Sequence, residues 1–225
     1  MAARPDAPLI GRYLDPAESL GEILFGLIMV LTVTIGTRLL TARDALNAHE
    51  IVVASVGCNI AWGIIDAVLF VLGNIFHRSQ RARLVRAVQS AGSEAEALAL
   101  IRRELEPDDA AVAIRPEDGA RFYRSVLAVA AHAGPARARL LHGDIVAALV
   151  VFLLVSATAV PGVIPFLVIA DPDIALRVSN LVLVLLLFVV GYVWAHRTDA
   201  SPWRVGLAVT LLGVLMVAVA VALGG

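Results

Sequence analysis

The amino-acid sequence predicts an all-α integral membrane protein with five transmembrane helices and a helical cytoplasmic insert between helices two and three. Sixty per cent of the 225 residues are hydrophobic, the mean hydropathy is +0.86, and only 16% of the residues are charged. Five apolar runs approach the roughly 20 residues that a helix needs to cross a bilayer. They cover residues 19–40, 51–75, 145–170, 178–195 and 205–225.

Polar segments divide the chain around these runs. Residues 1–18 form a predicted cytoplasmic N-terminal tail, and residues 19–76 hold the first two transmembrane helices. Residues 77–142 are polar and charged, with apolar positions spaced as in short helices, and form the predicted insert. Residues 143–225 hold helices three to five. The insert has eleven arginines against eight acidic residues, a balance that argues against nucleic-acid binding.

The distribution of arginine predicts the orientation of the chain in the membrane. The chain has 18 arginines and no lysine, and 15 of the arginines lie in segments that share a side with the N-terminus and the insert. Positive residues favour the cytoplasmic side. We therefore expect the N-terminus and the insert in the cytoplasm and the C-terminus outside. Arginine without lysine is typical of a GC-rich genome, which favours a bacterial inner membrane.

The first helix begins at a capping sequence and carries a polar face. Asp15 and Pro16 fit the N-cap and the first helical position, and Glu18 completes a capping-box-like pair. Glu22 and Met29 follow on one face, which is small, polar or soft, while Ile, Leu and Val fill most of the remainder. Glu22 either binds a cation or extends its carboxylate to the interface. Met29 either packs or offers a thioether ligand.

The second apolar run contains a single charged residue, Asp66. An ionised carboxylate at membrane depth costs several kcal/mol unless something compensates it. Asp66 is therefore a candidate for binding or moving a cation or a proton, and the alternative is a structural pair with a polar residue of another helix. Asn59 lies on the same face and Asn74 lies near the end of the run. Both asparagines fit inter-helix hydrogen bonds better than ligand roles.

The residues that the chain lacks exclude several classes of protein. One cysteine, Cys58, excludes an intramolecular disulfide framework and any Cys-rich zinc site. The sequence shows no nucleophile–base pair, no His-rich metal box and no glycine-rich phosphate loop. We therefore predict that the protein is not an enzyme and holds no cofactor.

Short motifs in the first three runs, namely Phe25-Gly26-Leu27, residues 66–74, and Pro161 with Pro165, together resemble those of the vacuolar iron transporter family of iron and manganese exporters. Phe25-Gly26-Leu27 resembles the family's first-span Asp-Gly-Leu, and the stretch from Asp66 to Asn74 resembles a second-span pattern that ends in Gly-Glu. Pro161 and Pro165 resemble its Ile-Pro-Leu-Leu-Pro stretch. The chain departs from the family at Phe25 and Asn74, which replace carboxylates, and its insert lacks the repeated Glu-x-x-Glu pattern. The resemblance implies a homodimer with the metal path between subunits.

The sequence and this resemblance lead to one leading hypothesis and one alternative. The leading hypothesis is a membrane transporter that exports Fe²⁺ or Mn²⁺ from the cytoplasm by proton antiport. The predicted metal ligands are Asp66, Glu22 and Met29, with Glu18, Asn59 and Asn74 as weaker candidates. Oxygen with a thioether suits these ions better than Zn²⁺, which prefers Cys and His. The alternative is a non-transporting membrane scaffold or regulator that keeps the helical bundle without its metal ligands.

Overall fold

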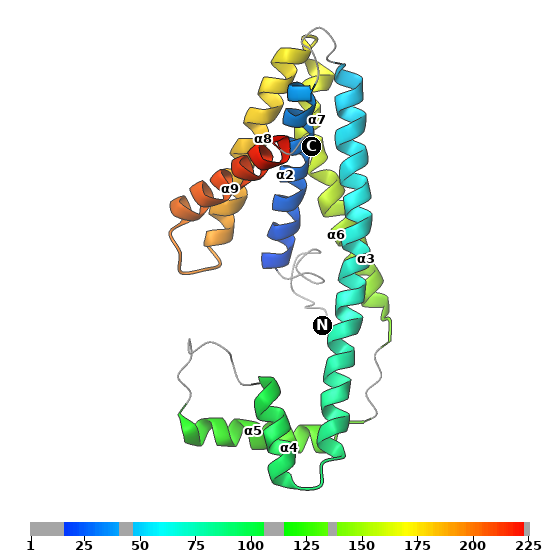
Figure 1. The fold of residues 1–225 in the computed structure, drawn as a ribbon, viewed down its shortest axis with the longest axis vertical. Helices are drawn as coiled ribbons and strands as arrows, with labels where there is room; N and C mark the ends of the chain where they lie inside the picture. Colours follow the sequence, from blue (N-terminus) through cyan, green and yellow to red (C-terminus); the bar gives the residue numbers. More distant parts are fainter. Residues whose placement is uncertain (1–15, 41–46, 106–114, 135–138, 223–225) are drawn as a thin grey trace. The chain divides into compact units, whose positions relative to one another are not determined.

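The computed structural model describes residues 16–40, 47–105, 115–134 and 139–222, and every regular element within these ranges is a helix (Figure 1). The predicted all-α class is therefore confirmed. The predicted N-cap Asp15 and most of the N-terminal tail lie outside the described residues. The helices are α2 (Pro16–Leu40), α3 (Ala48–Gln89), α4 (Glu94–Leu105), α5 (Pro116–Ala131), α6 (His142–Ala157), α7 (Ala159–Val168), α8 (Pro172–Ala195) and α9 (Pro202–Ala222).

Four segments of the described chain are long and apolar enough to cross a membrane. They are Glu18–Thr37, Ala48–Gln89, His142–Val168 and Pro172–Ala195. These spans confirm an integral membrane protein. The last helix, α9, is apolar and 21 residues long, and its described apolar stretch covers Pro202–Met216. The fifth span therefore stays a prediction.

Two helix boundaries differ from those that the apolar runs indicate. The third run is divided into α6 and α7 at Thr158, and Pro165 lies inside α7. The fourth run begins at residue 178, whereas α8 begins at Pro172. Asp171 explains the early start, because its side chain accepts hydrogen bonds from the backbone N–H groups of Asp173 and Ile174. A capped N-terminus with proline in the first turn is a favourable helix start.

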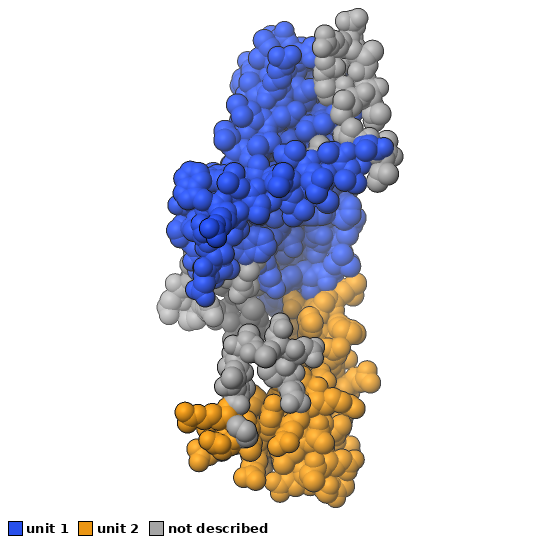
Figure 2. Space-filling model, turned by 60° about the vertical axis from the view of Figure 1, so that its left-hand side comes forward, with its two compact units in different colours: residues 1–70, 142–225 blue, residues 71–141 orange. Residues whose placement is uncertain are grey.

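The chain forms two compact units, which Figure 2 shows in different colours. Residues 1–70 and 142–225 make up the first unit, and residues 71–141 make up the second. The helix α3 contributes to both units, because it continues from the second apolar run to Gln89. The second unit occupies much the same residues as the predicted insert. Its cytoplasmic location stays a prediction.

The core of the first unit lies around α2. This helix contacts α6, α7, α8 and α9 (Figure 1). The buried cluster that joins α2 to α7 and α8 consists of Leu27, Val30, Leu31, Ala159, Leu183, Leu187 and Val190. A second cluster packs Ile51 of α3 against Phe166, Ala175 and Leu176. These contacts hold the helix pair that carries the candidate site.

Glycines let the helices of the first unit approach closely. A Cβ atom added at Gly162 of α7 would lie 2.6 Å from Val30 Cγ1 and 3.3 Å from Leu183. A Cβ atom at Gly206 of α9 would lie 2.8 Å from the Phe188 ring of α8. Such distances are far below an ordinary van der Waals contact. Small residues at these crossings are the usual means by which membrane helices pack.

The second unit has a small core of its own. Val88, Ala97, Ile101 and Ala130 are buried, and they join the end of α3 to α4 and α5. The Gln89 side-chain amide donates to the backbone oxygens of Ala130 at 3.0 Å and Ala133 at 2.9 Å. These contacts position α4 and α5, in a segment where the sequence predicts short helices.

Candidate functional site

Two contacts establish how α2 lies against α3. The rings of Phe25 and Trp62 meet edge to face, with centroids 5.3 Å apart. One residue further along α2, the Gly26 backbone oxygen accepts a hydrogen bond of 3.2 Å from Asn59 Nδ2. The residue number of the contact on α3 decreases while that on α2 increases, so the two helices run antiparallel. The same register brings the preceding turn of α2 opposite the following turn of α3.

The two carboxylates of the predicted site lie on these two turns. Glu22 of α2 and Asp66 of α3 are both half-buried, and the charge of Asp66 acts on Glu22. Glu18, one turn earlier on α2, is exposed and also acts on Glu22. The Asp66 Oδ2 atom is buried and has no hydrogen-bond partner among the described residues. Two neighbouring carboxylates in a membrane span are stabilised by a bound cation or a shared proton.

Asn59 is a hydrogen-bonding hub at the meeting point of three helices. Its side chain is fully buried, and its Nδ2 group bonds the Gly26 oxygen of α2, the Val155 oxygen of α6 at 3.1 Å and Thr158 Oγ1 at 2.9 Å. Thr158 Oγ1 in turn donates to the Val155 oxygen at 2.6 Å. The inter-helix role that the sequence favours for Asn59 is therefore present.

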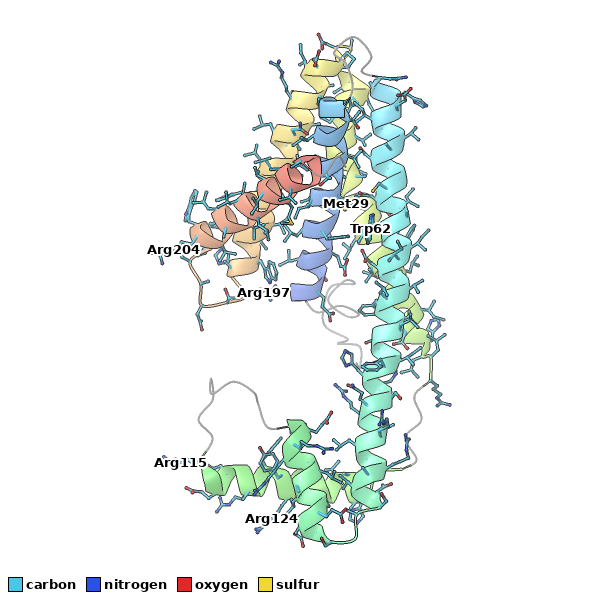
Figure 3. The ribbon with its side chains drawn as sticks, in the orientation of Figure 1. Met29, Trp62, Arg115, Arg124, Arg197 and Arg204 are labelled. Atoms are coloured by element: carbon cyan, nitrogen blue, oxygen red, sulfur yellow. The ribbon has the colours of Figure 1, made fainter. Side chains whose placement is uncertain are left out.

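The remaining candidates lie at other levels of the bundle. Met29 is half-buried on α2, two helical turns or about 10 Å beyond Glu22. Figure 3 labels Met29 on α2 and Trp62 on α3. Asn74 is half-buried on α3, eight residues or about 12 Å beyond Asp66. Within the described residues, no group of three or more His, Cys, Asp or Glu side chains is arranged to hold a metal ion.

A comparison with protein families finds one matching family. The sequence model of the VIT family matches residues 72–225, which is more than half of the chain. The chain belongs to the VIT family. A comparison with curated proteins finds no match.

Membership of the VIT family confirms the resemblance to vacuolar iron transporters. It places the protein among membrane metal transporters and not among enzymes. The matched residues begin after Asp66, so Glu22, Asn59 and Asp66 all precede them. The family match therefore says nothing about the roles of these three residues. Any role for them in this VIT family member depends on the geometry of α2 and α3.

Sequence reasoning did not single out three polar residues of this VIT family member, of which Ser55 and Asp144 are buried and Ser156 is half-buried. Ser55 of α3 is 1% exposed. It lies four residues before Asn59 and so on the same helix face, a spacing that would have identified it from the sequence. Ser156 of α6 lies beside α3, because a Cβ atom at Gly63 would lie 3.0 Å from its Oγ. Asp144 is buried in the first turn of α6, where a helix N-terminus favours a carboxylate.

Proposed function

We propose that this VIT family member exports Fe²⁺ or Mn²⁺ from the cytoplasm in exchange for protons, with Asp66 and Glu22 as the central cation ligands. The observation that supports this proposal most directly is the pair of half-buried carboxylates on facing helices, with Asp66 Oδ2 unpartnered among the described residues. A carboxylate pair within a membrane span is expected at an ion or proton pathway.

The proposed exchange follows from competition between the metal and the proton for the same oxygens. Glu22 and Asp66 repel each other when both are ionised, so the pair retains a proton when no metal is bound. A divalent cation neutralises both carboxylates and displaces that proton, because a metal ligand must be deprotonated. Protons from the opposite side then displace the metal. This linkage makes metal release dependent on the proton gradient.

The proposed ligands favour Mn²⁺ and Fe²⁺ over Zn²⁺. Two carboxylates supply hard oxygen, and Met29 supplies a thioether on the same face of α2, two turns away. We place Met29 at a second position that the ion reaches after the carboxylate pair. Glu18, Asn59 and Asn74 remain weaker candidate ligands, and water or a second copy of the chain completes the coordination.

The proposed transporter is a homodimer with its N-terminus and insert in the cytoplasm. The exposed apolar residues of α3 support a further contact for this helix. Val53, Ile64, Val68 and Leu72 are each more than half exposed. Lipid or a second copy covers such a surface in a membrane.

The decisive experiment is metal flux into proteoliposomes with the internal pH recorded. Wild-type protein is expected to move Fe²⁺ or Mn²⁺ saturably against protons, and Asp66→Asn is expected to lower the rate at least 100-fold while the protein remains folded. Glu50→Gln is the matched control, because Glu50 lies in the first turn of α3 and is exposed. Full transport by Asp66→Asn would refute the proposed role of Asp66.

A non-transporting scaffold or regulator is the second candidate function. One observation favours it: no group of three metal-binding side chains is present among the described residues. The resemblance drawn from the sequence also puts Phe25 in place of the family's first-span aspartate. Absence of flux for both ions from folded, correctly inserted wild-type protein would establish this alternative. Asp66→Asn would then alter stability alone.

A further inference from the structure

Four buried oxygen atoms along α3 and α6 have no hydrogen-bond partner among the described residues. They are Ser55 Oγ, Asn59 Oδ1, Ser156 Oγ and Asp66 Oδ2. Ser55 and Asn59 are 1% and 0% exposed. A buried polar atom without a partner is destabilising by roughly 1–3 kcal/mol, so native proteins rarely leave several together.

The four oxygens follow one line through the bundle, which we call the oxygen seam. Ser55, Asn59 and Asp66 are spaced by four and seven residues, so they share one face of α3. Ser156 reaches the same line from α6, beside Gly63, which lies between Asn59 and Asp66. The seam therefore has levels at residues 66, 63, 59 and 55 of α3. At the helical rise of 1.5 Å per residue it extends over about 16 Å.

The direction of the Asn59 amide is determined by its partners. Two of the three atoms that its Nδ2 group contacts are backbone oxygens, of Gly26 and Val155, and these can only accept. The nitrogen must therefore face them, and the unpartnered atom must be the oxygen. Asn59 thus presents a bare acceptor in the interior of the first unit.

The two serine hydroxyls differ from other hydroxyls in the same bundle. Thr32, Thr37 and Thr210 each donate to a backbone oxygen four residues earlier, at 2.8–2.9 Å. This bond is the usual way in which a helix satisfies a hydroxyl. Neither Ser55 nor Ser156 makes it. Their hydroxyls therefore keep both donor and acceptor capacity for another molecule.

The spacing of the seam fits water. Neighbouring levels are separated by about 4.5–6 Å, from the helical rise over three or four residues. One water that bonds an oxygen on each side, at about 2.8 Å per bond, bridges about 5.5 Å. A divalent metal ion requires about six ligands, whereas each level offers one oxygen. The seam thus fits water and protons better than the transported metal.

We propose that the oxygen seam binds a single file of water molecules that leads from the Ser55 level to the Asp66 level. Such a file offers protons a path along the seam, because each water accepts one proton and passes another on. No electron is transferred, and the serine and asparagine side chains keep their own protons. The use of these protons in metal exchange rests on the proposed function, whereas the hydration of the seam does not.

The hydration of the seam is testable without transport. In a Cys58→Ala background, Ser55→Cys and Ser156→Cys are labelled by X-ray hydroxyl-radical footprinting, in which radicals form from the water beside the thiol. Ser179→Cys is the matched control for Ser55→Cys, because Ser179 is as buried as Ser55 but donates to the Gly162 oxygen at 2.6 Å. We expect labelling of both seam variants at least tenfold faster than that of the control. Equal rates would overturn the proposal.

The delivery of protons is tested by removing the two hydroxyls. The double variant Ser55→Ala with Ser156→Ala is expected to slow proton-coupled metal flux about tenfold, with the metal dissociation constant unchanged, whereas Ser179→Ala leaves the flux at the wild-type rate. An unchanged flux in the double variant would overturn the proton role. If wild-type protein transports no metal, the proposed function fails, and the footprint still decides whether the seam is hydrated.

Discussion

The polar residues of α3 and α8 differ in how their hydrogen bonds are used. On α8, Ser179 donates to the Gly162 oxygen at 2.6 Å, and Asn180 Oδ1 accepts from Thr34 at 2.7 Å. On α3, the corresponding serine and asparagine, Ser55 and Asn59, each keep an oxygen without a partner among the described residues. Asn59 also joins helices through its Nδ2 group, so the difference is that the residues of α3 keep an unpartnered oxygen, whereas those of α8 use the corresponding oxygen in a bond between helices.

The two helices also differ in how much of their surface is covered. In the most apolar part of α8, 39% of the residues are buried, compared with 11% in that of α3. α8 packs against α2, α7 and α9, whereas eight large apolar side chains of α3 are exposed. The comparison teaches that α8 stabilises the bundle, whereas α3 keeps buried oxygens without partners among the described residues.

The largest difference in stability between the two regions is expected when a glycine is replaced by alanine. Gly162→Ala places a Cβ atom against Val30 and Leu183 and is expected to destabilise the protein by about 1–3 kcal/mol through overpacking. Gly57→Ala on α3 meets no atom within 4 Å and is expected to stabilise the helix by about 0.5–1 kcal/mol. Thermal unfolding in detergent measures both. A loss of stability in Gly57→Ala would mean that a partner covers this face of α3.

A smaller effect is expected from loss of the Asn59 amide. Asn59→Leu removes three hydrogen bonds that join α3 to α2 and α6. At about 0.6 kcal/mol for each bond between membrane helices, the variant should lose about 2 kcal/mol. Thr34→Val, which removes one bond to Asn180, is the control and should lose about 0.6 kcal/mol. Equal losses in denaturant unfolding would contradict the hub role of Asn59.

The smallest expected difference in stability is between alanine variants of two buried serines. Ser179→Ala removes a hydrogen bond between α8 and α7 and should lower stability by about 0.6 kcal/mol. Ser55→Ala removes a hydroxyl without a protein partner and should leave stability unchanged or slightly higher. Unfolding curves of the two variants, recorded under the same conditions, provide the measurement. A larger loss for Ser55→Ala would show that its hydroxyl stabilises the fold.

The helices and the central charge could be predicted from the sequence. Apolar runs near the length of a membrane span identify α2, α3, the α6–α7 segment and α8, because an apolar helix of that length is stable only in a membrane or a core. Asp66 stands out because no other charge occurs in residues 51–75. Helical spacing also placed Glu22 and Met29 on one face of α2.

The contacts between helices could not be predicted from the sequence. The division of the third run at Thr158 was not predicted, because two prolines indicate a bend without locating it. The three partners of Asn59 lie on α2 and α6, and helical periodicity does not reveal which helices meet. The apolar run that begins at residue 178 puts Ser179 near the start of its helix. Ser179 instead lies in the interior of α8, because Asp171 starts that helix earlier.

The glycine contacts between α8 and α9 have a consequence for motion. Gly191 lies against Val209, Gly206 lies against Phe188, and Leu187 fills the space beside Gly213, so neither helix can rotate without collision. These two helices therefore move as one rigid body. In the proposed transport cycle, the carboxylates open first to one side of the membrane and then to the other. Less tightly packed helices must make that movement. With the smallest buried share of the four spans, α3 is the element free to tilt.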